Sequence, residues 1–204
     1  GSTGHAVMNL NAGDQGNRRF ILVQLDETLD PGSVGRKRGY VTLADVARER
    51  LRRAGAQVKQ EAGLLVPDLD IGFRSLRVDG SNKADVLRTA DDTDQLGLDD
   101  LAPSIKPDRF AEDLLFQVLL DWGLELSLPI AREYWDGLEV LSVDADALIA
   151  CFAESVTPEV VRVIASRGPL RAVFRDDAFK SDAARINAEQ VFREVSPATE
   201  VRTI

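Results

Sequence analysis

The sequence predicts an α/β protein in which part of a parallel sheet is followed by a smaller mixed α/β domain. Three observations predict this class. Residues 1–78 show the order helix, strand, helix, strand, which is typical of a parallel sheet with covering helices. Residues 107–204 contain a second series of helical and strand patterns. Between the two, residues 79–103 are rich in acidic and turn-forming residues.

Composition and charge divide the chain in the same way. We expect residues 1–79 to form one part, 80–103 an acidic linker and 104–204 an accessory α/β domain. The net charge is −9 over 204 residues, but residues 1–60 carry 10 Lys and Arg against 6 Asp and Glu, a net +4. Residues 61–204 carry 15 against 28, a net −13. The basic part could approach an anion, whereas the acidic part argues against nucleic acid along the whole chain.

The first part begins with a helix expected over residues 3–12, with Ser2 or Thr3 as its N-cap. An apolar run at residues 20–25, followed at once by acidic residues, predicts a strand buried on both faces of a parallel sheet. Thr42, with Asp45 three residues later, predicts the start of a helix that runs to about position 58. Residues 71–78 alternate between apolar and polar types, which predicts a strand nearer the sheet edge.

The second part predicts a helix that begins after Asp108 and ends at Gly123. Two apolar runs then predict a hairpin, at residues 138–143 and 147–152. Further along the chain we expect a helix capped by Thr157, a strand, a helix capped by Ser181 and a last strand. The two strands are expected at residues 170–174 and 201–204, and the last helix is expected to turn Ile186, Val191 and Val195 inward.

The residues that could bind a ligand lie in the first part. Gly1, Ser2 and Thr3 enter the first helix, where backbone N–H groups can meet an anionic group. Gln24 and Glu27 come at the end of the first predicted strand, where a polar side chain can bind ribose hydroxyls. Together they indicate an adenosine-containing cofactor.

Two other features point to structure more than to chemistry. Asp176, Asp177, Lys180 and Asp182 could suggest a metal-dependent nuclease, but turn formation and helix capping explain such a cluster. Cys151 is the only cysteine, which excludes an internal disulfide, and its apolar neighbours predict an inert buried thiol. The sequence predicts no catalytic residue and no metal ligand.

A resemblance to a known family runs through the chain in blocks. The blocks are GSTGHAVMNLNA (1–12), GNRRFILVQL (16–25), LADVARERLRRA (43–54), DIGFR (70–74), DLLFQVLLDWGLELSLPI (113–130), ALIACF (147–152) and LRAVFRDDAFKSDAARINAEQVF (170–192). They resemble the Mod subunit of type III restriction-modification systems. Members of that family are adenine-specific DNA methyltransferases that use S-adenosylmethionine.

The resemblance implies a permuted methyltransferase order, in which the catalytic Asp-Pro-Pro-Tyr motif and the target-recognition region precede the cofactor glycine motif. The 204 residues contain no Asp-Pro-Pro-Tyr. The chain is therefore interpreted as a C-terminal fragment with part of a Rossmann-like S-adenosylmethionine-dependent methyltransferase sheet and without the catalytic centre. Alone, the fragment is expected to be inactive.

The family also implies roles for particular residues. Gly1, Ser2 and Thr3 match the end of the glycine-rich cofactor loop. Gln24 matches the ribose-binding position at the end of the second strand, with Glu27 as the alternative one turn further on. Asp79 stands where the family often contacts the adenine ring, although an Asp that caps a loop is the simpler interpretation.

The same resemblance implies partners. They are DNA, bound through the missing N-terminal part, a second Mod subunit in a homodimer, and the restriction (Res) subunit. No apolar run reaches membrane-spanning length, and we expect a cytoplasmic protein. Two alternatives remain open: a non-enzymatic protein-interaction module derived from such an enzyme, and a piece of a nicotinamide-dependent oxidoreductase. The latter requires a complete Gly-x-Gly-x-x-Gly, which the sequence does not contain.

Overall fold

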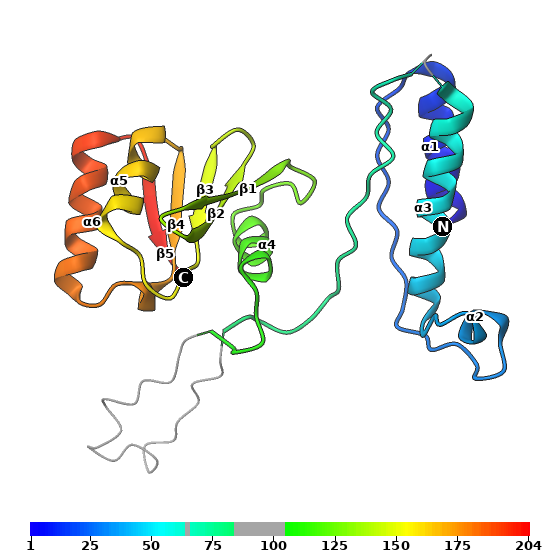
Figure 1. Cartoon of the computed structure of the whole chain (residues 1–204), viewed down its shortest axis with the longest axis horizontal. Coiled ribbons are helices and arrows are strands. Elements are labelled where there is room, and N and C mark those ends of the chain that lie inside the picture. The colour runs from blue at the N-terminus through cyan, green and yellow to red at the C-terminus, as the bar shows by residue number, and fades with distance from the viewer. Residues whose placement is uncertain (64–65, 84–104) are drawn as a thin grey trace, which may run out of the picture. The chain divides into compact units, whose positions relative to one another are not determined.

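The computed structural model describes residues 1–63, 66–83 and 105–204. The chain divides into two compact units, Gly1–Arg77 and Val78–Ile204, which can be followed by colour in Figure 1. Most of the acidic linker expected at 80–103 lies outside the described residues. Among the described residues, no helix has the length and apolar character needed to cross a membrane.

The described residues of the first unit form three α-helices: α1 (Ser2–Asp14), α2 (Val34–Lys37) and α3 (Leu43–Ala62). The N-cap of α1 is Gly1, so the expected capping by Ser2 or Thr3 is wrong. The expected start of α3 is confirmed, because Thr42 and Asp45 form a reciprocal capping box. The Asp45 N–H donates to Thr42 Oγ1 at 3.2 Å, and the Thr42 N–H donates to Asp45 Oδ2 at 2.8 Å.

The core of the first unit is small and lies between α1 and α3. Met8 of α1 and Leu51 and Val58 of α3 are almost fully buried there. Gly4 permits the close approach of the two helices, because a Cβ atom at this position would lie 2.6 Å from Leu51 Cδ2. Phe20 and other partly buried side chains pack around this contact.

The structure contradicts the two strands expected in the first unit. Residues 20–25 and 71–78 are irregular, and the side chains of Ile21 and Val23 are 92% and 89% exposed. A strand needs a hydrogen-bonded neighbour and an apolar cover, and sequence pattern alone supplies neither. In the described part of Gly1–Arg77, the strand-like pairing is one isolated bridge between Thr28 and Thr42. The expected parallel sheet of this unit is therefore wrong.

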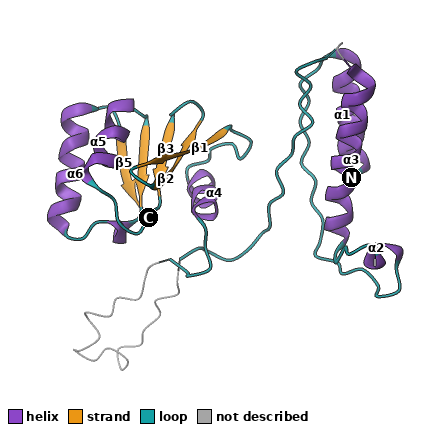
Figure 2. Ribbon diagram, in the orientation of Figure 1, coloured by secondary structure: helices purple, strands orange, loops and turns teal. Residues whose placement is uncertain are grey.

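The second unit contains a five-stranded mixed sheet with the spatial order β1-β2-β3-β4-β5. The strands are β1 (Ile130–Trp135), β2 (Leu138–Val143), β3 (Leu148–Cys151), β4 (Arg171–Phe174) and β5 (Glu200–Thr203). The first three strands are antiparallel neighbours, whereas β3, β4 and β5 run parallel. The parallel strands are connected through α5 (Pro158–Arg167) and α6 (Asp182–Val195), as Figure 2 shows. This sheet confirms the predicted α/β class.

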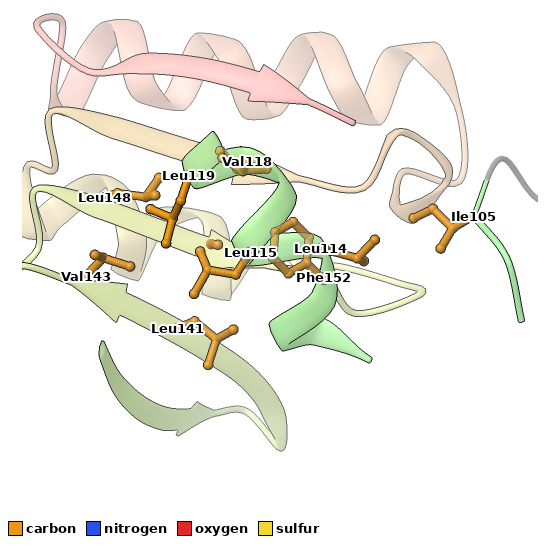
Figure 3. Close-up of a cluster of buried hydrophobic side chains, with 11 residues drawn as sticks. Ile105, Leu114, Leu115, Val118, Leu119, Leu141, Val143, Leu148 and Phe152 are labelled. Atoms are coloured by element: carbon orange, nitrogen blue, oxygen red, sulfur yellow. The ribbon is translucent and has the colours of Figure 1, made fainter. Parts of the chain in front are cut away.

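Helices cover both faces of the sheet, so its central strands are buried on both sides. Along β3, Leu148 and Ala150 face the core beneath α4 (Ala111–Asp121), whereas Ile149 and Cys151 face the core beneath α5 and α6. This alternation is the period of two expected of a strand. Figure 3 shows the first of these cores, where leucines of α4 meet the side chains of β2 and β3.

Most elements of the second unit agree with the sequence. The strands at 138–143, 147–152, 170–174 and 201–204 are confirmed by β2 to β5. Thr157 and Ser181 cap α5 and α6 as expected, and each accepts a bond from the backbone N–H three residues later. Three details differ. Strand β1 was not predicted, and α4 begins after Phe110 and not after Asp108. Helix α6 buries Ala188 and Phe192, whereas Ile186 and Val195, both expected to face inward, are 61% and 50% exposed.

Candidate functional site

The three candidates from the glycine-rich segment lie together at the start of α1. Gly1 is the N-cap, and Ser2 and Thr3 occupy the first turn, all three exposed to solvent. A Cβ atom on Gly1 would lie 3.0 Å from Arg50 Cδ, so this end of α1 lies against α3. The turn contains no acidic residue and no capping side chain. Its first backbone N–H groups therefore remain available to an acceptor.

Gln24 and Glu27 are exposed in an irregular segment and do not follow a buried strand. The Glu27 carbonyl accepts a hydrogen bond from the Leu43 N–H at 3.0 Å, which holds this segment beside the first turn of α3. Asp79 belongs to the second unit. There its carboxylate pairs with Arg109 Nη2 at 3.4 Å and accepts the Gly80 N–H at 2.7 Å. This geometry agrees with the loop-capping interpretation of Asp79.

Two surface pockets on α3, which share Tyr40, were not predicted from the sequence. The first has a volume of about 320 Å³ and is lined by His5, Arg38, Tyr40, Val46, Glu49, Arg50, Arg53, Ala54 and Gln57. The second has a volume of about 550 Å³ and is lined by Gly39, Tyr40, Val41, Asp45, Arg48, Arg52 and Ser75. None of the six predicted cofactor residues lines either pocket. The clustering of arginines between positions 36 and 53 was the sequence signal that could have found them.

The first pocket carries an excess of positive charge. Arg53 Nε donates to Glu49 Oε1 at 2.7 Å, and this bond is the main cause that raises the pKa of the Arg53 guanidinium. Glu49 also lies 3.8 Å from Arg52. Arg38 and Arg50 are exposed, and neither has a carboxylate partner among the described residues. One acidic side chain thus faces three arginines in this pocket.

The second pocket contains an acid that is held ionised. The Asp45 carboxylate accepts the backbone N–H groups of Thr42 and Val41, at 2.8 and 3.0 Å, and also contacts Arg48. These bonds, led by that of the Thr42 N–H, lower the pKa of Asp45 to about 2. Arg48 Nη1 in turn donates to Ser75 Oγ at 3.1 Å, which ties α3 to the segment that follows it.

We expect the Asp45 carboxyl to titrate with a midpoint of about 2, below its ordinary value of 3.8. Because the folded pKa is depressed, the stabilisation that Asp45 gives to α3 is fully present above about pH 4. It is lost as the pH falls from 3.8 towards 2. Carboxyl chemical shifts in an NMR pH titration measure the midpoint, and the Asp45→Asn variant identifies the signal. A midpoint near 3.8 would show that the capping box does not hold the carboxylate.

The acidic cluster of the second unit is occupied by ion pairs. Asp177 pairs with Arg175 at 2.6 Å, and Asp176 pairs with Arg185 at 2.6 Å. Within the described residues, no group of three His, Cys, Asp or Glu side chains could hold a metal ion. Asp176 and Asp177 are therefore accounted for by ion pairs in and beside the turn that links β4 to α6.

Part of this chain is similar in sequence to known proteins. No protein-family model matches the sequence. The chain is 39% identical over 77 residues to the type III restriction-modification enzyme StyLTI Mod subunit of Salmonella typhimurium. It is 40% identical over 75 residues to the type III restriction-modification enzyme EcoP15I Mod subunit of Escherichia coli.

The matches cover 38% and 37% of this chain, and 12% of the length of each relative. The matches thus cover less of this chain than the blocks of resemblance described above, and they span a small part of the length of each relative. Both relatives nevertheless carry the same subunit name. Over the matched region, this chain is related to the Mod subunits of type III restriction-modification enzymes.

Proposed function

We propose that this chain is part of an S-adenosylmethionine-dependent DNA adenine (N6) methyltransferase of a type III restriction-modification system. The observation that carries the proposal is the identity of 39% and 40% to two Mod subunits. In this proposal the chain is a C-terminal fragment that holds part of the cofactor site and lacks the catalytic motif. The protein acts in the cytoplasm, where DNA is present.

The cofactor site is proposed to include the first turn of α1. Gly1, Ser2 and Thr3 offer free backbone N–H groups and no competing acid, which fits an acceptor on the cofactor. Gln24 is exposed and its amide can both donate and accept hydrogen bonds, which fits ribose hydroxyls. Glu27 is the alternative ribose ligand. Bound S-adenosylmethionine would supply the methyl group, and these residues would bind and orient it.

The second unit is proposed to serve assembly, with a second Mod subunit in a homodimer and with the restriction (Res) subunit. Its support is electrostatic, because residues 78–204 carry 25 acidic against 13 basic side chains. Such a surface repels the DNA backbone and suits contact with protein. DNA would be bound by the part of the enzyme that precedes this chain in sequence.

A segment exchange tests the proposed function. The residues of this chain that match the StyLTI Mod subunit replace the corresponding residues of that subunit, and transfer of labelled methyl groups from S-adenosylmethionine to duplex DNA is measured. We expect a rate within about tenfold of the parent, which corresponds to ~1.4 kcal/mol of lost transition-state stabilisation. The control exchange uses the matching EcoP15I residues. An active control beside a folded but inactive exchange would contradict the proposal.

One observation favours a second candidate, an interaction module derived from such an enzyme. Three neighbouring apolar side chains are strongly exposed: Ile21 by 92%, Val23 by 89% and Leu25 by 75%. Such exposure is unusual in a domain that folds without a partner. A protein partner could cover them. The segment exchange separates the two candidates, since a module that has lost its cofactor role would not support methyl transfer.

A further inference from the structure

The strongest local charge of the first unit lies between α2 and the middle of α3. Positions 36–53 hold seven basic residues and two acidic ones, Asp45 and Glu49. Arg48 pairs with Asp45, and Arg52 and Arg53 share Glu49. The basic residues Arg36, Lys37, Arg38 and Arg50 are all exposed and have no carboxylate partner among the described residues.

Two of these unpaired arginines line the first α3 pocket, the one of about 320 Å³ that also contains Tyr40. The other polar groups of that pocket include the Tyr40 hydroxyl and the His5 imidazole, which can donate hydrogen bonds. The Gln57 amide donates one hydrogen bond to Glu61 Oε1 at 2.7 Å and has a second N–H for a ligand. Arginine, tyrosine and glutamine are among the side chains with which proteins contact phosphate oxygens. A pocket of this composition fits a ligand with several negative charges.

The same composition disfavours the methyl donor as the ligand of this pocket. S-adenosylmethionine carries a sulfonium and an ammonium group, and three arginines would repel both. The five residues of the first unit proposed for the cofactor do not line the pocket. The pocket is therefore a second site that shares no residue with the proposed cofactor site but adjoins it, because a Cβ atom on Gly1 would lie 3.0 Å from Cδ of the pocket residue Arg50.

We propose that Arg38 and Arg50, with Tyr40 and Gln57, bind the phosphate backbone of duplex DNA. The choice of DNA over other polyanions rests on the proposed function, whereas the choice of a polyanion rests on the pocket. A duplex fits better than a single strand, because single-strand binding relies on several stacked aromatic rings and Tyr40 is the one aromatic side chain lining this pocket. The contact positions DNA without reading its sequence.

This proposal assigns DNA contact to the chain itself, in addition to the part of the enzyme that precedes it. Backbone contacts release counterions, so their number is measured by the dependence of affinity on salt. Each phosphate contact contributes about −0.9 to the slope of log K against log salt concentration for B-DNA. Non-specific binding of this kind has Kd values of roughly 10⁻⁴–10⁻⁶ M at physiological salt.

The test compares two double variants of the whole 204-residue chain. In the first, Arg38→Gln and Arg50→Gln remove the unpaired charges of the pocket. In the control, Arg162→Gln and Arg193→Gln remove two exposed charges of the second unit, so the net charge changes equally. Anisotropy of a fluorescent mixed-sequence duplex is measured over a series of salt concentrations, without S-adenosylmethionine, and circular dichroism checks that both variants fold.

We expect the pocket variant to reduce the magnitude of the salt slope by about 1.8, and the control to leave it unchanged within about 0.5. An excess of unlabelled duplex should displace the labelled one, and polyglutamate should not. Absence of binding by the unaltered chain, equal effects of the two variants, or displacement by polyglutamate would each overturn the proposal. The segment exchange reads methyl transfer and not this binding, so failure of the proposed function would be recognised separately.

Discussion

Replacing Phe174 by alanine should lower the free energy of unfolding of Val78–Ile204 by about 3–5 kcal/mol. Phe174 is 0% exposed in β4, at the centre of the core between the sheet and helices α5 and α6. Its ring meets those of Phe179 and Phe192 edge to face, with centroids 5.6 and 6.1 Å apart. Alanine would leave a cavity beside the rings of Phe179 and Phe192. Because the side chains of this core are closely packed, they can move little to fill the cavity.

Urea unfolding followed by tryptophan fluorescence measures this loss in the second unit alone, because both tryptophans, Trp122 and Trp135, lie there. The matched control is Phe110→Ala, since Phe110 is 77% exposed at the start of α4. We expect the control to change the stability by no more than about 0.5 kcal/mol. A similar loss in the two variants would show that the core between β4 and α6 is not packed as described.

The Cys151 thiol should react with a disulfide reagent at least about a thousandfold more slowly in the native chain than in urea. Cys151 is 0% exposed in β3, and burial raises the pKa of its thiol, with Glu139 adding to the effect. The thiolate is the reactive form, so both access and ionisation are suppressed. Reaction then requires opening of the unit, and an opening free energy of ~4 kcal/mol corresponds to about a thousandfold protection.

Absorbance of the released thiol measures the rate, and the chain has no other cysteine to interfere. The control places a single thiol on the surface, with Ala183→Cys in a Cys151→Ala background, because Ala183 is exposed on α6. That thiol should react at nearly the same rate in the native chain and in urea. Rapid reaction of Cys151 in the native state would show that β3 is accessible at the centre of the sheet.

The two units differ in how far their structure followed from the sequence. In the second unit, hairpin residues, helix caps and apolar runs all pointed to the same elements, and β2 to β5 formed where expected. The strand that the sequence did not predict there was β1, whose central residues Arg132 and Glu133 interrupt any apolar run. As an edge strand, β1 is held by its antiparallel register with β2, a contact that sequence pattern does not encode.

In the first unit, the sequence predicted two strands that the described residues do not form. Residues 20–25 have the composition of a buried strand, yet Ile21 and Val23 face solvent. A helix satisfies its hydrogen bonds within itself, so α1 and α3 could be predicted from local sequence. A strand depends on a partner that lies elsewhere in the chain or in another chain, and local sequence does not supply it.

The candidate sites also differ in how far the sequence predicted them. The sequence indicated Gly1, Ser2 and Thr3 as one group, and they do form one exposed turn, because neighbours in a chain stay neighbours in space. It did not indicate the basic pocket, whose residues come from α1, the segment before α3, and one face of α3.

The sequence by itself determined the α/β class, the capping box of α3, the caps of α5 and α6, and the relation to type III Mod subunits, since all of these depend on local residue order. Only the tertiary structure decided which apolar runs become strands and which arginines remain unpaired. Strand pairing and ion pairing join residues far apart in the chain, and their outcome depends on which groups the fold brings within bonding distance.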